Sequence, residues 1–68
     1  MSKEDDTLSQ LSQQIEEGKW RVGERLPAER RLAAVLGASR NTVRNALRVL
    51  EARGVVDIRR GSGCYLRS

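Results

Sequence analysis

Apolar residues recur at helical spacing in residues 39–53, which carry the strongest pattern of the chain. A helix with apolar side chains at i, i+3, i+4 and i+7 packs one face on a core and leaves the other face polar. The positions that follow this spacing are Val43, Ala46, Leu47 and Leu50. Ser39 stands where an N-cap belongs, because its hydroxyl can accept from the backbone N–H of Asn41 or Thr42. We therefore predict a core-facing helix over residues 39–53.

A shorter helical pattern covers residues 26–36. Its apolar positions are Leu32, Val35 and Leu36. Pro27 suits a first helical turn, because proline has no backbone N–H to leave unpaired. Gly37 follows, where a helix often ends in a left-handed residue. Two helices joined by a short turn that includes glycine are typical of a helix-turn-helix.

A third apolar face lies nearer the N-terminus. Residues 1–6 are polar and are expected to form a flexible tail, after which Asp6 or Thr7 caps a helix that ends at Gly18. The apolar face of this helix is Leu8, Leu11 and Ile15. Its role is structural, since it covers the core of the other two helices. In the connector that follows, Trp20 is expected to anchor packing rather than to stack on nucleic-acid bases.

Alternating residues near the C-terminus predict a β-hairpin. Residues 55–59 form its first strand, residues 60–63 a turn in which two glycines supply positive φ, and residues 64–66 the returning strand. Residues 25–26 are expected to pair with this end of the chain. A hairpin after a helix-turn-helix is a wing, with an ordinary basic hairpin as the alternative. The expected fold class is therefore α+β and mostly α: a winged helix-turn-helix of three helices and a C-terminal β-hairpin over residues 7–68.

Charge is divided unevenly along the 68 residues. Residues 1–18 hold one basic and five acidic side chains, a net charge of −4, whereas residues 19–68 hold twelve basic and four acidic ones, a net charge of +8. Eleven of those twelve are arginines, whose fork-shaped guanidinium suits phosphates and base edges. The second part therefore favours a polyanion. Nucleic acid is preferred over an anionic membrane, because no segment pairs a basic face with exposed bulky apolar residues.

Several classes of protein are excluded by what the sequence lacks. There is no histidine, and Cys64 is the single cysteine, so a disulfide framework and metal sites built on histidine or several thiolates are ruled out. A chain this short has no room for a substrate cavity of ordinary size, and nothing in it pairs carboxylates for catalysis. The polar N-terminus is neither a signal peptide nor a membrane span. We expect a cytoplasmic domain that is not an enzyme, holds no metal or cofactor and does not bind a membrane.

A basic ridge follows the polar side of the longest predicted helix. Arg40, Arg44 and Arg48 lie at i, i+4 and i+8, with Asn41 and Asn45 on the next ridge. Arginine and asparagine match guanine and adenine edges in a major groove. A solvated helix face is the alternative for the arginines alone, but the turn and cap in front of them favour duplex DNA. Ion pairs that locked Arg40 and Arg44 onto acidic neighbours would contradict this interpretation.

The order of these motifs over residues 8–66 resembles the GntR family of bacterial transcription regulators. The positions that carry the resemblance are Gly18, Trp20, Gly23, Leu26-Pro27-Ala28-Glu29-Arg30, Leu32-Ala33, Leu36-Gly37, Ser39-Arg40, Thr42-Val43-Arg44, Ala46-Leu47, Leu50, Gly54-Val55-Val56 and Arg60-Gly61-Ser62-Gly63. The sequence departs from the family where Ala28 replaces a common serine and Asn45 replaces a common glutamate. The first departure leaves the shorter helix without a side-chain cap.

The resemblance implies a winged helix-turn-helix that binds double-stranded operator DNA as a homodimer. It implies DNA contacts from Arg30, Ser39, Arg40, Asn41, Thr42 and Arg44, and it implies that Arg60 and Gly61 of the wing reach a minor groove. The helical ridges add Asn45 and Arg48 to these candidates. Family members carry a second domain that binds a small-molecule effector and dimerises, and this chain is expected to lack it. Within the family, the helix region most resembles the FadR-type branch. The second domain of that branch is an all-helical bundle that binds small carboxylic acids, often with a metal.

These observations predict recognition of a pseudo-palindromic operator, because the symmetry of a dimer is repeated in its site. Two alternatives remain at this point: a winged helix used for protein–protein contact, and an RNA-binding module. Weak salt dependence of DNA binding would indicate the first. Competition by duplex RNA would indicate the second, since a recognition helix does not enter the deep, narrow groove of A-form RNA.

Overall fold

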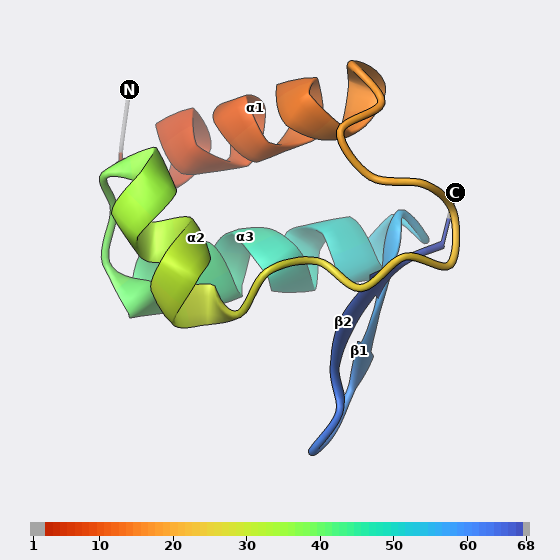
Figure 1. Cartoon of the computed structure of the whole chain (residues 1–68). Coiled ribbons are helices and arrows are strands. Elements are labelled where there is room, and N and C mark those ends of the chain that lie inside the picture. Colours follow the sequence, from red (N-terminus) through yellow and green to blue (C-terminus); the bar gives the residue numbers. More distant parts are fainter. Residues whose placement is uncertain (1–2, 68) are drawn as a thin grey trace.

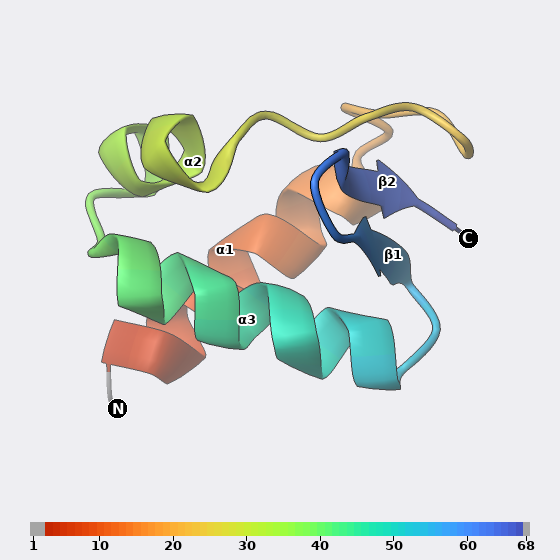
Figure 2. The same ribbon diagram turned by 90° about the horizontal axis from the view of Figure 1, so that it is seen from below.

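Three helices and a two-stranded antiparallel sheet follow one another along the chain (Figure 1). The computed structural model describes residues 3–67, with these elements: α1 (Lys3–Glu16), α2 (Glu29–Leu36), α3 (Arg40–Ala52), β1 (Val56–Arg59) and β2 (Gly63–Leu66). In Figure 1, α1 and α2 pack on α3, and the hairpin projects away from the helices. Figure 2 shows the hairpin beside the C-terminal half of α3, with α1 behind. This arrangement confirms the predicted winged helix-turn-helix.

The core lies among the three helices and continues under the base of the hairpin. Its largest members are Leu11, Trp20, Leu26, Leu32, Leu36, Val43, Leu47, Leu50, Val56 and Leu66. The predicted apolar stripe of α3 is buried along its whole length. Burying one such side chain contributes about 1.5–3 kcal/mol, so the stripe fixes the rotation of α3 about its axis. Trp20 is only 7% exposed, which confirms its predicted role as a packing anchor.

The first helix begins earlier than the sequence pattern indicated. α1 starts at Lys3, so residues 3–6 are helical and do not form a flexible tail, while residues 1–2 lie outside the described part of the chain. Thr7 is not a cap but a core-facing residue that is 2% exposed. Its small, β-branched side chain fits against the core in the same row as Leu11, one turn further along. A helical register set by packing has here overridden a local capping signal.

The second helix begins later than predicted. α2 starts at Glu29, with Ala28 at the N-cap and no side-chain hydrogen bond there, which confirms that this position lacks a side-chain cap. Pro27 therefore precedes the helix. The prediction was wrong because Leu26 is held in an extended segment beside β2. Val35 is 58% exposed, since α2 buries the neighbouring row Leu32, Ala33 and Leu36 instead.

The hairpin has the predicted turn. Val56 lies opposite Leu66 and Arg59 opposite Gly63, so the two strands are joined by residues 60–62. Gly61 has φ of 77°, a left-handed conformation that only glycine adopts without strain. The turn is therefore specified by the sequence itself.

A short extended segment before α2, residues 25–26, pairs with β2 at the base of the hairpin. The backbone N–H of Leu26 donates to the carbonyl of Cys64 at 2.8 Å, and Arg25 forms an isolated antiparallel bridge with Tyr65. This pairing was predicted from residues 25–26. It matters because a two-stranded hairpin alone is marginally stable, whereas three strands packed on a helix hold their register.

Candidate nucleic-acid interface

The first turn of α3 is organised by its cap. Ser39 Oγ accepts a hydrogen bond from the backbone N–H of Thr42 at 3.1 Å. The sequence predicted either Asn41 or Thr42 as the donor. The same hydroxyl lies 2.8 Å from Thr42 Oγ1. The two side chains are thus hydrogen-bonded to each other. The free backbone N–H groups of the first turn give this end of the helix a partial positive charge. Such an end attracts a phosphate.

Three arginines follow one side of α3, as the spacing indicated. Arg40 and Arg48 are exposed, and neither forms an ion pair within residues 5–67. Asn41 and Asn45 are also exposed. The rise of an α-helix places Arg40 and Arg48 roughly 12 Å apart along the axis. The ridge is therefore comparable in length to the width of a major groove, about 12 Å.

Arg44, the middle arginine of the ridge, is held by an acidic partner. Its Nε donates to Glu29 Oε2 at 3.2 Å and its Nη2 donates to Oε1 at 3.0 Å. The expectation that the ridge projects free of acidic neighbours is therefore wrong for Arg44, although it holds for Arg40. The pair uses two of the five N–H donors of the guanidinium, and the Arg44 side chain is still 42% exposed. Three donors remain available to a ligand.

The carboxylate of Glu29 sits among the three arginines of the ridge. Hydrogen bonds from Arg44 are the main cause of its lowered pKa, opposed by partial burial and supported by the charges of Arg44, Arg40 and Arg48. The same bonds raise the pKa of Arg44. Glu29 is thus ionised at neutral pH. One acid against three arginines leaves this side of α3 positive.

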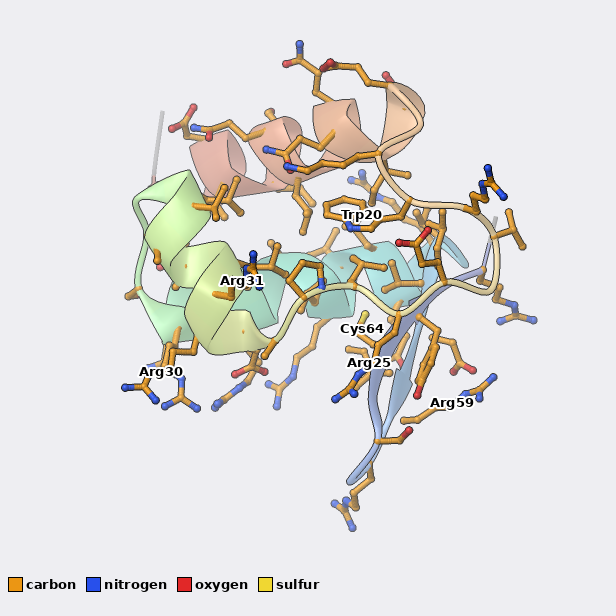
Figure 3. All side chains as sticks on the ribbon, viewed as in Figure 1. Trp20, Arg25, Arg30, Arg31, Arg59 and Cys64 are labelled. Atoms are coloured by element: carbon orange, nitrogen blue, oxygen red, sulfur yellow. The ribbon has the colours of Figure 1, made fainter. Side chains whose placement is uncertain are left out.

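Side-chain contacts stabilise one side of the wing. Arg59 Nε contacts Asp57 Oδ2 at 3.2 Å, and its guanidinium carbon lies 4.5 Å from the centre of the Tyr65 ring. The Tyr65 hydroxyl is 2.6 Å from Ser62 Oγ. Figure 3 shows Arg59 on the side of the hairpin that faces away from Arg25 and Cys64. Arg59, at the end of β1, is therefore already occupied by contacts within the hairpin.

The tip of the wing consists of Arg60 and Gly61, which are both exposed. A Cβ on Gly61 would meet no atom within 4 Å, so the backbone there is open to an approaching ligand. Arg60 forms no ion pair within residues 5–67. The tip thus combines a cation with accessible backbone, as the sequence indicated.

A groove runs between α3 and the wing. Its walls include Arg40, Arg44 and Arg48 on one side and residues 58–63 on the other. Arg30, in the first turn of α2, lies at the edge of the same face (Figure 3). The structure thus brings together, on one face, side chains from α2, α3 and the wing that the sequence selected separately. Which of them touch DNA stays a prediction.

Two residues of the groove were not selected from the sequence. Glu29 was quoted only as part of a motif, yet it positions Arg44 across 15 residues of chain. Arg25 was assigned only a strand pairing, yet its guanidinium reaches the groove. No local pattern signals either contact, because each depends on how separate elements pack.

Cys64 faces the core beneath the hairpin and is 8% exposed. Burial is the main reason that the pKa of its thiol rises to about 11, with smaller contributions from Glu51 and Asp57. The thiol is therefore protonated at neutral pH and is a poor nucleophile. This agrees with the predicted role of a small strand residue.

The described residues contain neither a metal cluster nor a membrane helix. No group of three or more histidine, cysteine or acidic side chains within residues 3–67 could hold a metal ion. In the same range, every helix is too short or too polar to cross a bilayer. The expectation that the domain needs no cofactor stays a prediction.

The family follows from comparison with known proteins. Residues 4–66 match the model of the family described as bacterial regulatory proteins, gntR family. The chain belongs to the GntR family. This confirms the resemblance drawn from the sequence, and it agrees with the expectation of a regulator rather than an enzyme.

Individual relatives support the assignment. The GntR chain is similar to the Exu regulon transcriptional regulator of Escherichia coli (strain K12), with 45% identity over 58 residues, which are 85% of this chain and 22% of that protein. It is similar to the solved structure of Streptococcus agalactiae GntR, with a TM-score of 0.87 and 38% identity over 96% of this chain and 31% of that one. The chain thus spans less than a third of either protein.

Some similar structures were solved in complex with an operator. AraR(DBD) in complex with operator ORX1 has a TM-score of 0.88 and 27% identity to this GntR chain, over 97% of this chain and 80% of that one. The likeness extends over helices and wing together. It confirms the winged helix-turn-helix fold.

Proposed function

We propose that this GntR domain binds double-stranded DNA in a sequence-specific manner. The first turns of α3 enter a major groove, and the wing reaches the adjacent minor groove. The observation that carries the proposal is the groove itself, where the ridge of α3 and the tip of the wing face the same space. The likeness to AraR(DBD), which was solved with its operator, supports it further.

Each candidate residue has a role that its geometry supports. Arg40 and Arg44 read bases, guanines in particular, because an arginine fork matches the O6 and N7 atoms of guanine. Asn41 and Asn45 lie beside them on the exposed side of α3. The residues assigned to the sugar-phosphate backbone are Arg30, Ser39, Thr42 and Arg48. Ser39 and Thr42 suit this role because they form the positive end of α3.

The wing has a different task. The minor groove is about 6 Å wide and distinguishes mainly A·T from G·C pairs. Arg60 is an exposed cation next to the open backbone of Gly61, which fits insertion into a narrow, electronegative minor groove. The wing therefore adds affinity and a preference for groove shape.

The larger assembly is also part of the proposal. A homodimer formed by a further domain would present two copies of this groove to a pseudo-palindromic operator. That further domain would bind a small-molecule effector. Such a regulator would act in the cytoplasm, where its DNA is found. An isolated domain is expected to bind weakly, because the second half-site no longer shares the entropic cost of association.

Selection of bound duplexes from a random pool tests the proposal most directly. A recurring sequence is expected among the bound duplexes, and an inverted repeat of it where the protein is dimeric, because two half-sites mirror the symmetry of a dimer. Binding to the selected duplex should weaken steeply as salt rises, since several phosphates are contacted. The proposal would be overturned if no sequence were enriched in the pool. It would also be overturned if duplex RNA displaced the bound DNA as effectively as competing duplex DNA does. Binding with little salt dependence would instead favour a protein–protein module.

A further inference from the structure

Arg25 occupies a fixed place at the base of the wing. The backbone on either side of it is pinned to β2, because Leu26 N–H donates to the Cys64 carbonyl at 2.8 Å and Leu66 N–H donates to the Glu24 carbonyl at 2.9 Å. Leu26 is 2% exposed and points into the core. Side chains alternate across an extended segment, so Arg25 points the other way, out of the core.

The side chain of Arg25 crosses the hairpin at Gly63. A Cβ on Gly63 would lie 2.6 Å from Arg25 Nε, which is closer than real Cβ atoms come to other atoms, and 3.2 Å from Nη2, which is a tight contact. The missing side chain of Gly63 therefore makes the space in which the guanidinium lies. Figure 3 shows Arg25 directed toward the same edge of the molecule as Arg30, on the opposite side of the hairpin from Arg59.

No acid within residues 5–67 neutralises Arg25. The ion pairs of this part of the chain are Arg44–Glu29 and Arg59–Asp57. The other acid that borders the groove is Glu51, and its Oε2 accepts from the backbone N–H of Ile58 at 3.1 Å. Arg25 is thus an exposed, unpaired cation on the wall of the groove.

The geometry of duplex DNA indicates which part of the DNA would lie next to Arg25. Neighbouring major and minor grooves are separated by one sugar-phosphate strand. If α3 lies in the first groove and the wing in the second, that strand must cross the groove between them. We propose that Arg25 binds a phosphate of this crossing strand and thereby joins the contacts of the helix to those of the wing. The inference rests on the function proposed above and adds a binding residue to it.

The chemistry of Arg25 fits this role. A guanidinium donates two parallel N–H bonds to a phosphate, and it is already oriented because its backbone is paired and its side chain is laid over Gly63. A phosphate contact fixes the position of the protein on the duplex without reading sequence. Arg25 therefore contributes equally to binding of cognate and non-cognate duplexes, unlike Arg40 and Arg44.

The test compares Arg25→Gln with wild type in titrations of a fluorescent duplex at several salt concentrations. Loss of one phosphate contact is expected to make the slope of log K against log salt shallower by about 0.9 and to weaken binding about five- to tenfold at 0.1 M salt. The loss should be the same for cognate and random duplexes. Arg25→Lys should keep the slope. The matched control is Arg31→Gln, which removes an exposed arginine outside the groove and should change neither quantity.

A second measurement locates the phosphate without altering the protein. Single phosphates of the duplex are replaced by uncharged methylphosphonates, one at a time. At one position between the two grooves, the replacement should weaken wild-type binding but leave Arg25→Gln unaffected. The inference is overturned if wild type binds the duplex and Arg25→Gln binds with the same affinity and salt slope, or if every methylphosphonate weakens the two proteins equally. Absence of duplex binding by wild type would overturn the proposed function itself.

Discussion

The two sides of the groove hold their arginines in different ways. On α3, Arg44 is paired with Glu29 of another helix, and the two partners are separated by 15 residues and partly buried. On the wing, Arg59 is paired with Asp57, two residues away, and the side chains are 60% and 46% exposed. Exposed pairs of the second kind contribute about 0–1 kcal/mol. One pair links two elements, whereas the other only arranges a single strand.

This contrast separates the tasks of the two regions. A pair between elements sets the direction of a side chain relative to the whole fold, which a base-reading residue needs. The local pair on the wing occupies Arg59 with Asp57, whereas Arg60 at the tip forms no ion pair within residues 5–67. We propose that the helix side discriminates between sequences and that the wing side supplies charge. The following experiments test that division, from the largest expected effect to the smallest.

The strongest expected difference lies in stability. Leu47 on α3 is 3% exposed, whereas Ile58 on the wing is 37% exposed. Leu47→Ala is expected to lower the free energy of unfolding by about 2–5 kcal/mol, because it leaves a cavity in the core. Ile58→Ala should cost much less, since its side chain is already in contact with water. Urea denaturation followed by circular dichroism measures both. Equal losses would show that the wing is as firmly packed as α3.

The next largest effect concerns base reading. Arg44→Ala is expected to weaken binding to the selected duplex about 5- to 150-fold at fixed salt and to relax specificity at one position. Arg59→Ala removes the same charge, but from an arginine already paired with Asp57 on the wing, and should have little effect. Titration against duplexes that vary at each position gives both results. A variant Arg44→Ala that binds and discriminates as wild type does would remove Arg44 from the readout.

A smaller effect is expected when the partner of Arg44 changes. Glu29→Gln removes a negative charge near the phosphates, so binding to random duplexes should strengthen. It also weakens the hold on Arg44, so the ratio of specific to non-specific affinity should fall about fivefold. Glu51→Gln is the matched control, because it removes an acid from the same groove and leaves the pair intact. A fall of the ratio in both variants would mean that charge alone matters.

The smallest effect is expected in the dependence of stability on pH. The pKa of Glu29 is lowered in the folded chain, chiefly by hydrogen bonds from Arg44. The stabilisation is therefore complete above the ordinary carboxyl value near 4.5 and is lost as pH falls through the lower folded value. Urea denaturation between pH 3 and 7 should show a fall toward low pH that is reduced in both Glu29→Gln and Arg44→Gln. An unchanged profile in these variants would mean that the pair does not stabilise the fold.

Much of the fold could be predicted because its signals are local. The stripe of α3, the Ser39 cap and the glycine turn of the hairpin each depend on residues a few positions apart. The less accurate predictions concern element boundaries. α2 starts at Glu29 because the segment before it pairs with β2, and α1 starts at Lys3 rather than after a polar tail. Neither boundary follows from the residues at the boundary alone.

The sequence by itself determined the elements, their order, the sign of the charge and the arginines of α3, since periodicity and turn chemistry act over one or two helical turns. Only the tertiary structure decided which of those arginines are held and which are free. Glu29 reaches Arg44, and Arg25 lies over Gly63, because α2, α3 and the hairpin pack at particular positions around one core. Contacts between residues far apart in the chain depend on that packing, and no local pattern encodes them.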